Sequence, residues 1–266
     1  ARQFESELFN DLRNGDKKGS TTHIDSLDEH FTWMKKDVVV FAGYPNMGKT
    51  EFEYFLNVLK SIKSGWKWAI AGLEEKDGNR FFRKLIEMYV GKRITVSDER
   101  KYGQFKMTEN ELRTGLDFIN SHFFWVKPEN KFAKGTIFDA FDYTVAKHGV
   151  DGIILDPFNK LVKETKAGLR DDELLVDYYR SCEEFAISHD VVSVTITHMN
   201  KPEKVVNDLV PMPTAYSILG GQATNNAVDE IVFVHRMSSD YKDKDRVIRT
   251  AKGRDQDLVG VPGDIT

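Results

Sequence analysis

The segment GYPNMGKT places two glycines, a lysine and a threonine at the spacing of a phosphate-binding loop. It follows the apolar run VVVFAG and precedes a helix-like segment, which is the context that the Gly-x-x-x-x-Gly-Lys-Thr pattern requires. A glycine turn that only connects strand and helix is the competing interpretation, and the lysine and threonine in register disfavour it. The loop is expected to comprise Gly43, Tyr44, Pro45, Asn46, Met47, Gly48, Lys49 and Thr50.

Each residue type in this loop has a defined task in phosphate chemistry. Backbone amides in a glycine-rich turn at a helix N-terminus surround the β- and γ-phosphates. Lys49 brings positive charge to the transferred group, and the Thr50 hydroxyl can ligate Mg²⁺. We therefore predict a site for ATP, or for a deoxynucleoside triphosphate, together with Mg²⁺.

Carboxylates follow two other apolar runs. Asp156 ends GIILD and suits the acidic residue that holds Mg²⁺ through water, although such an Asp can also be a turn residue or a helix cap. Glu74 and Glu75 end IAGLEE, and a carboxylate there can polarise a water for attack on the γ-phosphate, which indicates hydrolysis. One of the two is expected only to begin a solvated helix, and the residues alone leave open which.

A histidine and an arginine complete the set of candidates. His198 ends VVSVTITH, where it could contact the γ-phosphate and report its loss to the next loop; a plain hydrogen-bonded role is the alternative. Arg254, in the segment KGR, is uninformative by itself, because most arginines lie on solvated surfaces.

From Asp37 onward, strand-like and helix-like segments alternate, which predicts an α/β fold with a mostly parallel central sheet flanked by helices on both faces. Thr108 and Glu111 form a capping box that opens a helix to about His122. Further helices are expected at 51–64, 80–90, 135–148 and 170–189, and strands at 38–43, 66–73, 123–126, 151–156, 191–198, 230–236 and 245–252.

Length and composition set limits on the class of protein. A chain of 266 residues suits one α/β domain at 21–266, preceded by an amphipathic helix and connector at 1–20. The balance of 38 basic and 42 acidic residues, net −4, disfavours binding of nucleic acid by bulk attraction. One cysteine and the lack of a long apolar run favour a soluble protein with no membrane partner in a reducing compartment. We expect the cytoplasm, or a host cytoplasm for a phage protein, with the mitochondrial matrix as an alternative.

The motifs GYPNMGKT, GLEE, GIILD, THMNKP, GGQATNNAVDEIVFVHR and RTAKGR occur in an ordered series. This series resembles the RecA-type motor domain of the DnaB-like hexameric replicative helicases, and looks most similar to the phage primase-helicase and Twinkle branch. The resemblance covers about residues 21–266 and implies a RecA-like P-loop NTPase fold. It further implies that residues 1–13 form a linker helix that docks on a neighbouring subunit of a homo-oligomer, as a hexameric ring.

The resemblance also assigns roles to single residues. It implies Lys49 and Thr50 on nucleotide and metal, Asp156 on the metal and Glu74, which directly follows the last leucine of its strand, as the catalytic glutamate. His198 would be the γ-phosphate sensor. Arg236 and Lys252 would assist at the nucleotide from the subunit interface, and Arg254 would be the arginine finger that reaches the ATP of a neighbour. Since such a finger contributes roughly a thousandfold or more in rate, hydrolysis should depend on assembly.

Single-stranded DNA is the expected partner, in a central channel. The residues expected to contact its phosphates are Asn200, Lys201 and Lys204, in the loop after His198. A ring needs few such contacts per subunit, which reconciles DNA binding with a net charge of −4. A primase domain or protein is a further expected partner, and the resemblance implies 5′ to 3′ movement and a final strand beyond GVPGDIT. Asn226 stands where the family usually has glutamine, which leaves the coupling role of that motif open.

Three functions are compatible with these residues. The leading one is an ATP-driven hexameric DNA helicase that translocates on single strands during replication. A RecA-like or KaiC-like ATPase that forms a filament or a regulatory ring without unwinding shares the fold. A nucleotide-gated interaction module is a third, and Glu74 argues against it, because a pure switch has little use for a carboxylate that activates water.

Overall fold

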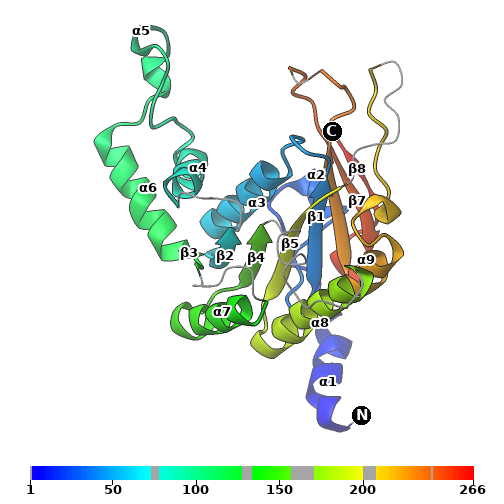
Figure 1. Cartoon of the computed structure of the whole chain (residues 1–266). Coiled ribbons are helices and arrows are strands. Elements are labelled where there is room, and N and C mark those ends of the chain that lie inside the picture. The colour runs from blue at the N-terminus through cyan, green and yellow to red at the C-terminus, as the bar shows by residue number, and fades with distance from the viewer. Residues whose placement is uncertain (1, 73–77, 128–133, 157–170, 200–207, 241) are drawn as a thin grey trace.

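A single eight-stranded sheet runs through the computed structural model, which describes residues 2–72, 78–127, 134–156, 171–199, 208–240 and 242–266. Its strand order is β3-β2-β4-β5-β1-β6-β7-β8 (Figure 1). The strands are β1 (Val38–Gly43), β2 (Trp68–Gly72), β3 (Phe123–Trp125), β4 (Gly152–Asp156), β5 (Val192–His198), β6 (Glu230–His235), β7 (Val247–Gly253) and β8 (Gly263–Ile265).

Strands β1 to β6 pair in parallel, and β7 and β8 add antiparallel to the edge. Every residue of β1 and β6 is buried, as expected for strands covered on both faces. The predicted α/β fold with a mostly parallel sheet is therefore confirmed. A strand that was not predicted, β8, lies within GVPGDIT and pairs with β7 through Ile265 and Ile248.

Helices cover both faces of the sheet. α3 (Lys49–Ser64), α4 (Gly78–Val90) and α6 (Glu109–His122) lie on one face, and α7 (Lys134–His148), α8 (Asp171–His189) and α9 (Gln222–Ala227) on the other (Figure 1). The side chains of β1 alternate between the two apolar cores: Val38, Val40 and Ala42 face one, and Val39 and Phe41 the other. This packing fixes the direction of β1 and so the place of the loop that follows it.

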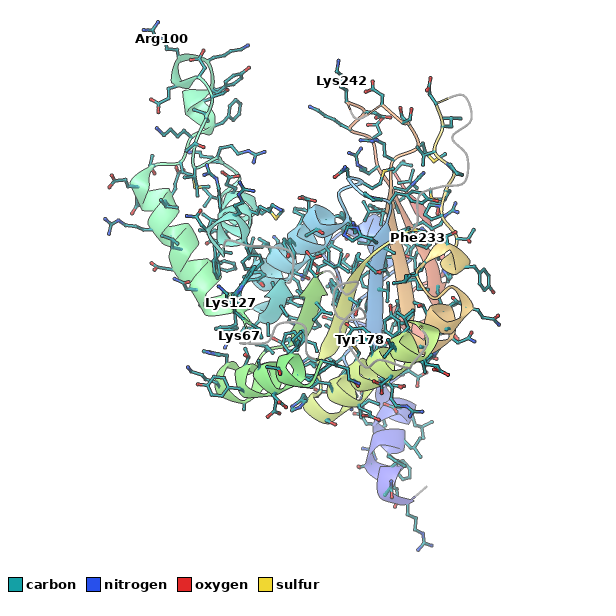
Figure 2. All side chains as sticks on the ribbon, in the orientation of Figure 1. Lys67, Arg100, Lys127, Tyr178, Phe233 and Lys242 are labelled. Atoms are coloured by element: carbon teal, nitrogen blue, oxygen red, sulfur yellow. The ribbon has the colours of Figure 1, made fainter. Side chains whose placement is uncertain are left out.

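The capping box predicted at the start of α6 is present. The Thr108 hydroxyl accepts from the Glu111 amide at 3.2 Å, and the Glu111 carboxylate accepts from the Thr108 amide at 2.8 Å. Before it, α5 (Glu99–Tyr102) forms a projecting arm with Arg100 near its tip (Figure 2). The arm and the loop between β6 and β7, where Lys242 is labelled, extend beyond the same edge of the sheet (Figure 2).

The N-terminal helix α1 (Glu5–Asn14) projects away from the rest of the molecule (Figure 1). Its predicted apolar residues are exposed, with Leu8 at 58% and Leu12 at 79%. The chain rejoins the main body at Gly19, whose amide donates to the Leu258 carbonyl at 2.9 Å. The remaining short helices are Arg2–Phe4, α2 (Asp25–Asp28), Gly103–Phe105, Ala215–Ser217 and α10 (Gln256–Val259). Among the described residues, none of the helices is both long and apolar enough to cross a bilayer.

Candidate functional site

The phosphate-binding loop lies between the carboxyl end of β1 and the first turn of α3. Asn46 and Gly48 both have positive φ, 63° and 88°, and this conformation turns backbone amides toward the inside of the loop. At Gly43 a Cβ atom would lie 2.6 Å from the Val234 carbonyl oxygen, so only glycine lets β1 end this close to β6. The loop has the backbone of an anion cradle, at the start of a helix whose dipole also favours an anion.

Lys49, the first residue of α3, lies in this cradle. Its side chain is buried, and its Nζ is 2.8 Å from Nδ1 of His198, which ends β5. The pairing of Gly43 with His198 in neighbouring strands brings the two residues together. Because an ammonium can only donate, Nδ1 accepts and the proton of the neutral imidazole is on Nε2. The structure thus joins two residues that the sequence placed 149 positions apart.

Asp156 ends β4, beside β5 in the sheet, and so lies at the same edge as Lys49 and His198. The buried Tyr54 hydroxyl donates to Oδ2 of Asp156 at 3.0 Å and orients the carboxylate. Glu53 lies below it: burial raises the pKa of this carboxyl well above its ordinary value, and the charge of Asp156 raises the pKa further. Burial and the nearby Asp156 charge therefore both favour the protonated form of Glu53.

The donor set fits Mg²⁺ bound together with a nucleotide. No group of three His, Cys, Asp or Glu side chains forms a metal site among the described residues. Mg²⁺ commonly takes one or two protein oxygens, water and substrate phosphates, so the Thr50 hydroxyl and Asp156 beside an anion cradle suffice. Neither residue would hold a metal tightly without the phosphates.

Five of the candidate residues lie outside the described ranges. Glu74 and Glu75 are two of them, and they follow β2, whose last residue Gly72 pairs with Asp156. The other three are the predicted DNA contacts Asn200, Lys201 and Lys204.

Arg254 lies at the opposite end of the strands from the phosphate loop, near the amino-terminal ends of β6 and β1. It follows β7, whose last residue Gly253 pairs with Glu230 at the start of β6, while Glu230 in turn pairs with Val39 of β1. Because a strand rises about 3.3 Å per residue, the four steps from Val39 to Gly43 separate Arg254 from the loop of its own chain by roughly 13 Å or more. Arg254 cannot serve the cradle of the same chain in this arrangement.

The Arg254 side chain is held by the body of its own chain. Its Nη1 forms an ion pair with Oδ1 of Asp229 at 2.7 Å, and Nη2 donates to the Asn226 and Val228 carbonyls at 3.3 Å. Lys252 donates to the Asn225 and Val228 carbonyls. Burial lowers the pKa of Lys252, and the Arg254 charge lowers it further. Both cations therefore lie against the end of α9.

The buried carboxyl of Glu230 and the half-buried carboxyl of Asp37 lie next to this ion pair. Burial raises the pKa of Asp37 to about 7, with the Asp229 charge adding to the effect. Burial also raises the pKa of Glu230 well above its ordinary value, and Asp37 raises it further. The positive charge of Arg254 lowers the pKa of both carboxyls and so partly offsets the effect of burial.

Arg236 follows the carboxyl end of β6. Because β6 runs parallel to β1, this is the end of the strands at which the phosphate loop lies. It is only 8% exposed, and its Nε donates to the Ser238 carbonyl at 2.9 Å. The loop after it returns as Arg246, which donates through Nε to the Met47 carbonyl at 3.1 Å. Arg236 and Arg254 thus lie at opposite ends of the strands.

Sequence reasoning missed three side chains that contact predicted residues or the loop: Tyr54, Asp229 and Arg246. Tyr54 reads as one more apolar position of α3, and its contact with Asp156 spans 102 residues. Asp229 directly precedes a predicted strand, where a carboxylate could have been examined as a partner for Arg254. Arg246 lies in a loop rich in Asp and Lys, where no sequence signal distinguishes it.

Comparison with known proteins finds the same architecture elsewhere. The chain superposes on a solved ATPase domain with a TM-score of 0.77 and 18% identity, over 99% of this chain and 93% of that one. It superposes with a TM-score of 0.76 and 19% identity on a DnaB-like replicative helicase solved in a study of its interactions with primase, over 98% of this chain and 64% of that one. These likenesses confirm the predicted RecA-like ATPase fold.

A sequence relative extends the comparison. The chain is 24% identical over 236 residues to the Twinkle homolog protein, chloroplastic/mitochondrial, of Arabidopsis thaliana. The match covers 87% of this chain and 32% of the relative, so the chain spans about a third of that protein's length. No family model matches the chain. The predicted resemblance to the motor domain of DnaB-like helicases, Twinkle branch included, is confirmed.

Proposed function

We propose that this chain, which has the RecA-type ATPase fold of the DnaB-like replicative helicases, is the motor domain of an ATP-dependent hexameric DNA helicase that translocates on single-stranded DNA. One observation carries the proposal: Lys49, His198 and Asp156 meet at one end of the strands, while Arg254 lies at the other. A nucleotide site of this kind is complete only when a second copy supplies its cation.

The cradle side of the mechanism uses residues of one chain. Backbone amides of 46–48 and the Lys49 ammonium bind the β- and γ-phosphates, and binding exchanges His198 for phosphate oxygen as the partner of Lys49. Thr50 and Asp156 would hold Mg²⁺, which would supply positive charge next to the phosphates. Glu74 accepts a proton from the attacking water, and Tyr54 keeps the Asp156 carboxylate oriented.

The other side of the mechanism comes from the neighbouring copy. Arg254 leaves Asp229 to reach the γ-phosphate of the neighbour, with Lys252 beside it, whereas Arg236 adds positive charge to the interface from the cradle side. The exposed apolar side chains of α1 provide a surface for docking on an adjacent copy. Assembly therefore controls the rate of hydrolysis.

Movement along DNA follows from the position of His198. This residue is the last of β5, and Asn200, Lys201 and Lys204 follow it closely in the sequence. Loss of the γ-phosphate changes the partner of His198 and moves this segment, whose lysines bind the DNA backbone. The proposal also includes a role in replication, movement in the 5′ to 3′ direction and a primase partner. It places the protein in the cytoplasm or the mitochondrial matrix.

Unwinding of a forked DNA duplex tests the proposal most directly. With ATP the wild-type protein should separate the strands, whereas a non-hydrolysable analogue should support DNA binding without separation. The Lys49→Ala variant is the matched control and should lose both hydrolysis and unwinding. DNA-stimulated ATPase activity without any unwinding would contradict the helicase function and favour a RecA-like or KaiC-like ATPase. Full hydrolysis by Lys49→Ala would place the cradle elsewhere.

A further inference from the structure

Arg246 connects the start of β7 to the phosphate loop. Its Nε donates to the Met47 carbonyl at 3.1 Å across a sequence separation of 199 residues. Met47 lies between Asn46 and Gly48, the two loop residues with positive φ. The contact therefore holds the Met47 carbonyl, between two residues whose left-handed backbone is typical of anion-binding loops.

The guanidinium is fixed by its own loop as well. Its Nη1 donates to the Asp243 carbonyl at 3.0 Å and to the Asp245 carbonyl at 2.8 Å. The Asp243 carboxylate accepts from the Asp245 amide at 2.9 Å and stays with its own turn. Arg246 is thus held by three carbonyls, and its orientation is set before any ligand arrives.

Two properties of this guanidinium are unused within the described part of the chain. Among the described residues, its Nη2 has no hydrogen-bond partner, and no Asp or Glu carboxylate forms an ion pair with it. Carbonyl partners satisfy donors but do not neutralise the charge. A full positive charge therefore remains at the loop, with two N–H donors available.

The charge lies close to the predicted phosphate loop. The Nε of Arg246 is 3.9 Å from the position that a Cβ atom on Gly48 would take, next to the residue that begins α3. An arginine at this place adds to the field of the inward amides, the helix dipole and Lys49. Guanidinium groups also match phosphate oxygens in geometry better than an ammonium does.

We propose that Arg246 is a nucleotide-binding residue that acts in its own chain, donating from Nη2 to the polyphosphate of the bound nucleoside triphosphate while its Nε keeps the Met47 carbonyl turned outward. The proposal rests on the proposed function, in which residues 43–50 bind that nucleotide. The loop between β6 and β7 would then line the nucleotide site. Arg246 would bind the nucleotide of its own chain, whereas Arg254 would act on the nucleotide of a neighbour.

The test compares three substitutions in the full chain. Arg246→Gln removes the charge, Arg246→Lys keeps it, and Lys244→Gln removes the charge of an exposed lysine in the same loop. The affinity for ATP and ADP with Mg²⁺ is measured with a fluorescent nucleotide. Arg246→Gln should raise Kd about tenfold, since charge-assisted hydrogen bonds are the stronger class. Arg246→Lys should fall between it and the wild type, and Lys244→Gln should bind as the wild type does.

A second readout separates phosphate contact from a purely structural role. Removal of a charged hydrogen bond makes Kd less sensitive to salt, so the dependence on ionic strength should be shallower for Arg246→Gln than for the wild type. The thermal midpoint without nucleotide is measured for all three variants, so that a loss of stability from the carbonyl contacts of Arg246 is separated from a loss of affinity. Wild-type affinity in Arg246→Gln, equal affinities of Arg246→Gln and Arg246→Lys, or an unchanged salt dependence would overturn the proposal.

The failure of this proposal and that of the proposed function give different results. Lys49→Ala serves as the reference, because its side chain lies within the cradle. If Lys49→Ala weakens nucleotide binding while Arg246→Gln does not, only the role of Arg246 is overturned. If the wild type and Lys49→Ala bind nucleotide equally, both proposals are overturned.

Discussion

The Lys49 ammonium donates to Nδ1 of His198 at 2.8 Å, at the point where β1 and β5 end side by side. The nitrogen of the phosphate-binding lysine is thereby occupied by the residue that we expect to sense the phosphate. We expect a bound nucleotide to compete with His198 for the Lys49 ammonium, so binding should change the contacts of His198.

His198→Ala should separate nucleotide binding from nucleotide use. Because Lys49 is freed of a competing partner, the Kd for ATP should stay the same or fall, whereas kcat should drop at least tenfold for want of the sensor. Equilibrium binding and steady-state ATPase assays measure the two effects. His122→Ala is the control, since His122 stacks on Phe118 at the end of α6, away from the site. Weaker ATP binding with normal kcat would assign His198 to affinity alone.

Tyr54→Phe should raise the Mg²⁺ requirement. The substitution keeps the ring that packs edge-on against Phe81 and removes only the hydroxyl that orients Asp156. Since outer hydrogen bonds to metal-binding carboxylates contribute about 10-fold to 100-fold in metal affinity, the Mg²⁺ concentration for half-maximal ATPase activity should rise by about tenfold. Tyr143→Phe, in an exposed tyrosine of α7, is the control. An unchanged Mg²⁺ titration would show that Tyr54 has no role in metal binding.

Mixed oligomers should recover activity that each parent lacks. Arg254→Ala removes the donated cation and Glu74→Ala disables the receiving cradle, so mixing them creates some interfaces with both parts intact. ATPase activity of the mixture should exceed that of either variant alone. A mixture of Lys49→Ala and Glu74→Ala should stay inactive, because both changes affect the cradle side. No recovery in the first mixture would count against a finger that acts between subunits.

Asp37 should make the folded state sensitive to pH. Its pKa in the fold is about 7, against about 4 in the unfolded chain, so the folded state binds the extra proton between these values. The free energy of unfolding therefore falls as pH rises from about 4 to 7. Asp37→Asn should remove part of this slope and stabilise the protein at pH 8 by about 1 kcal/mol or more relative to wild type.

Urea unfolding of the wild type and of Asp37→Asn at pH 5 and pH 8 measures this difference. Glu111→Gln is a useful contrast, because the pKa of Glu111 is lowered to about 2, chiefly by the hydrogen bond from Lys92, and its contribution changes with pH in the opposite direction. If Asp37→Asn showed the same pH slope as the wild type, Asp37 would ionise normally in the fold.

Replacing Lys201 and Lys204 together with Ala should weaken binding to single-stranded DNA and flatten its dependence on salt. Removal of one lysine–phosphate interaction reduces the slope of log K against log salt by about 0.7 on a single strand. Fluorescence anisotropy with a labelled oligonucleotide at several salt concentrations measures it. Lys17→Ala with Lys18→Ala, in the connector after α1, is the matched pair. A slope equal to that of the wild type would show that Lys201 and Lys204 do not bind the DNA backbone.

Local pattern was enough to predict most of the fold. The apolar runs at 38–43 and 152–156 and the capping box at Thr108 and Glu111 are properties of neighbouring residues, and the structure has the corresponding elements within about two residues. The position of the cradle followed from its pattern for the same reason. By contrast, β8 was missed because three residues, Gly263–Ile265, are too short to show alternation.

The partners of the predicted residues could not be read in this way. Tyr54 meets Asp156, Arg246 meets Met47 and Asp229 meets Arg254 only because the strand order and the return of β7 bring distant segments together. Nothing in the local sequence encodes which strand lies beside which. The separation of Arg254 from Lys49 to opposite ends of the strands depends on β7 being antiparallel, which the alternation of strands and helices did not predict.

The placement of Lys49 and Arg254 at opposite ends of the strands determines how many complete sites an assembly of such copies can contain. Each copy would present a nucleotide cradle on one side and the Arg254 side chain on the other. An open row of copies would therefore leave one cradle without an arginine at one end and one arginine without a cradle at the other. Only a closed ring would complete every site, and a ring open at one interface would lose the activity of one site. Turnover per chain would then report whether the ring is closed.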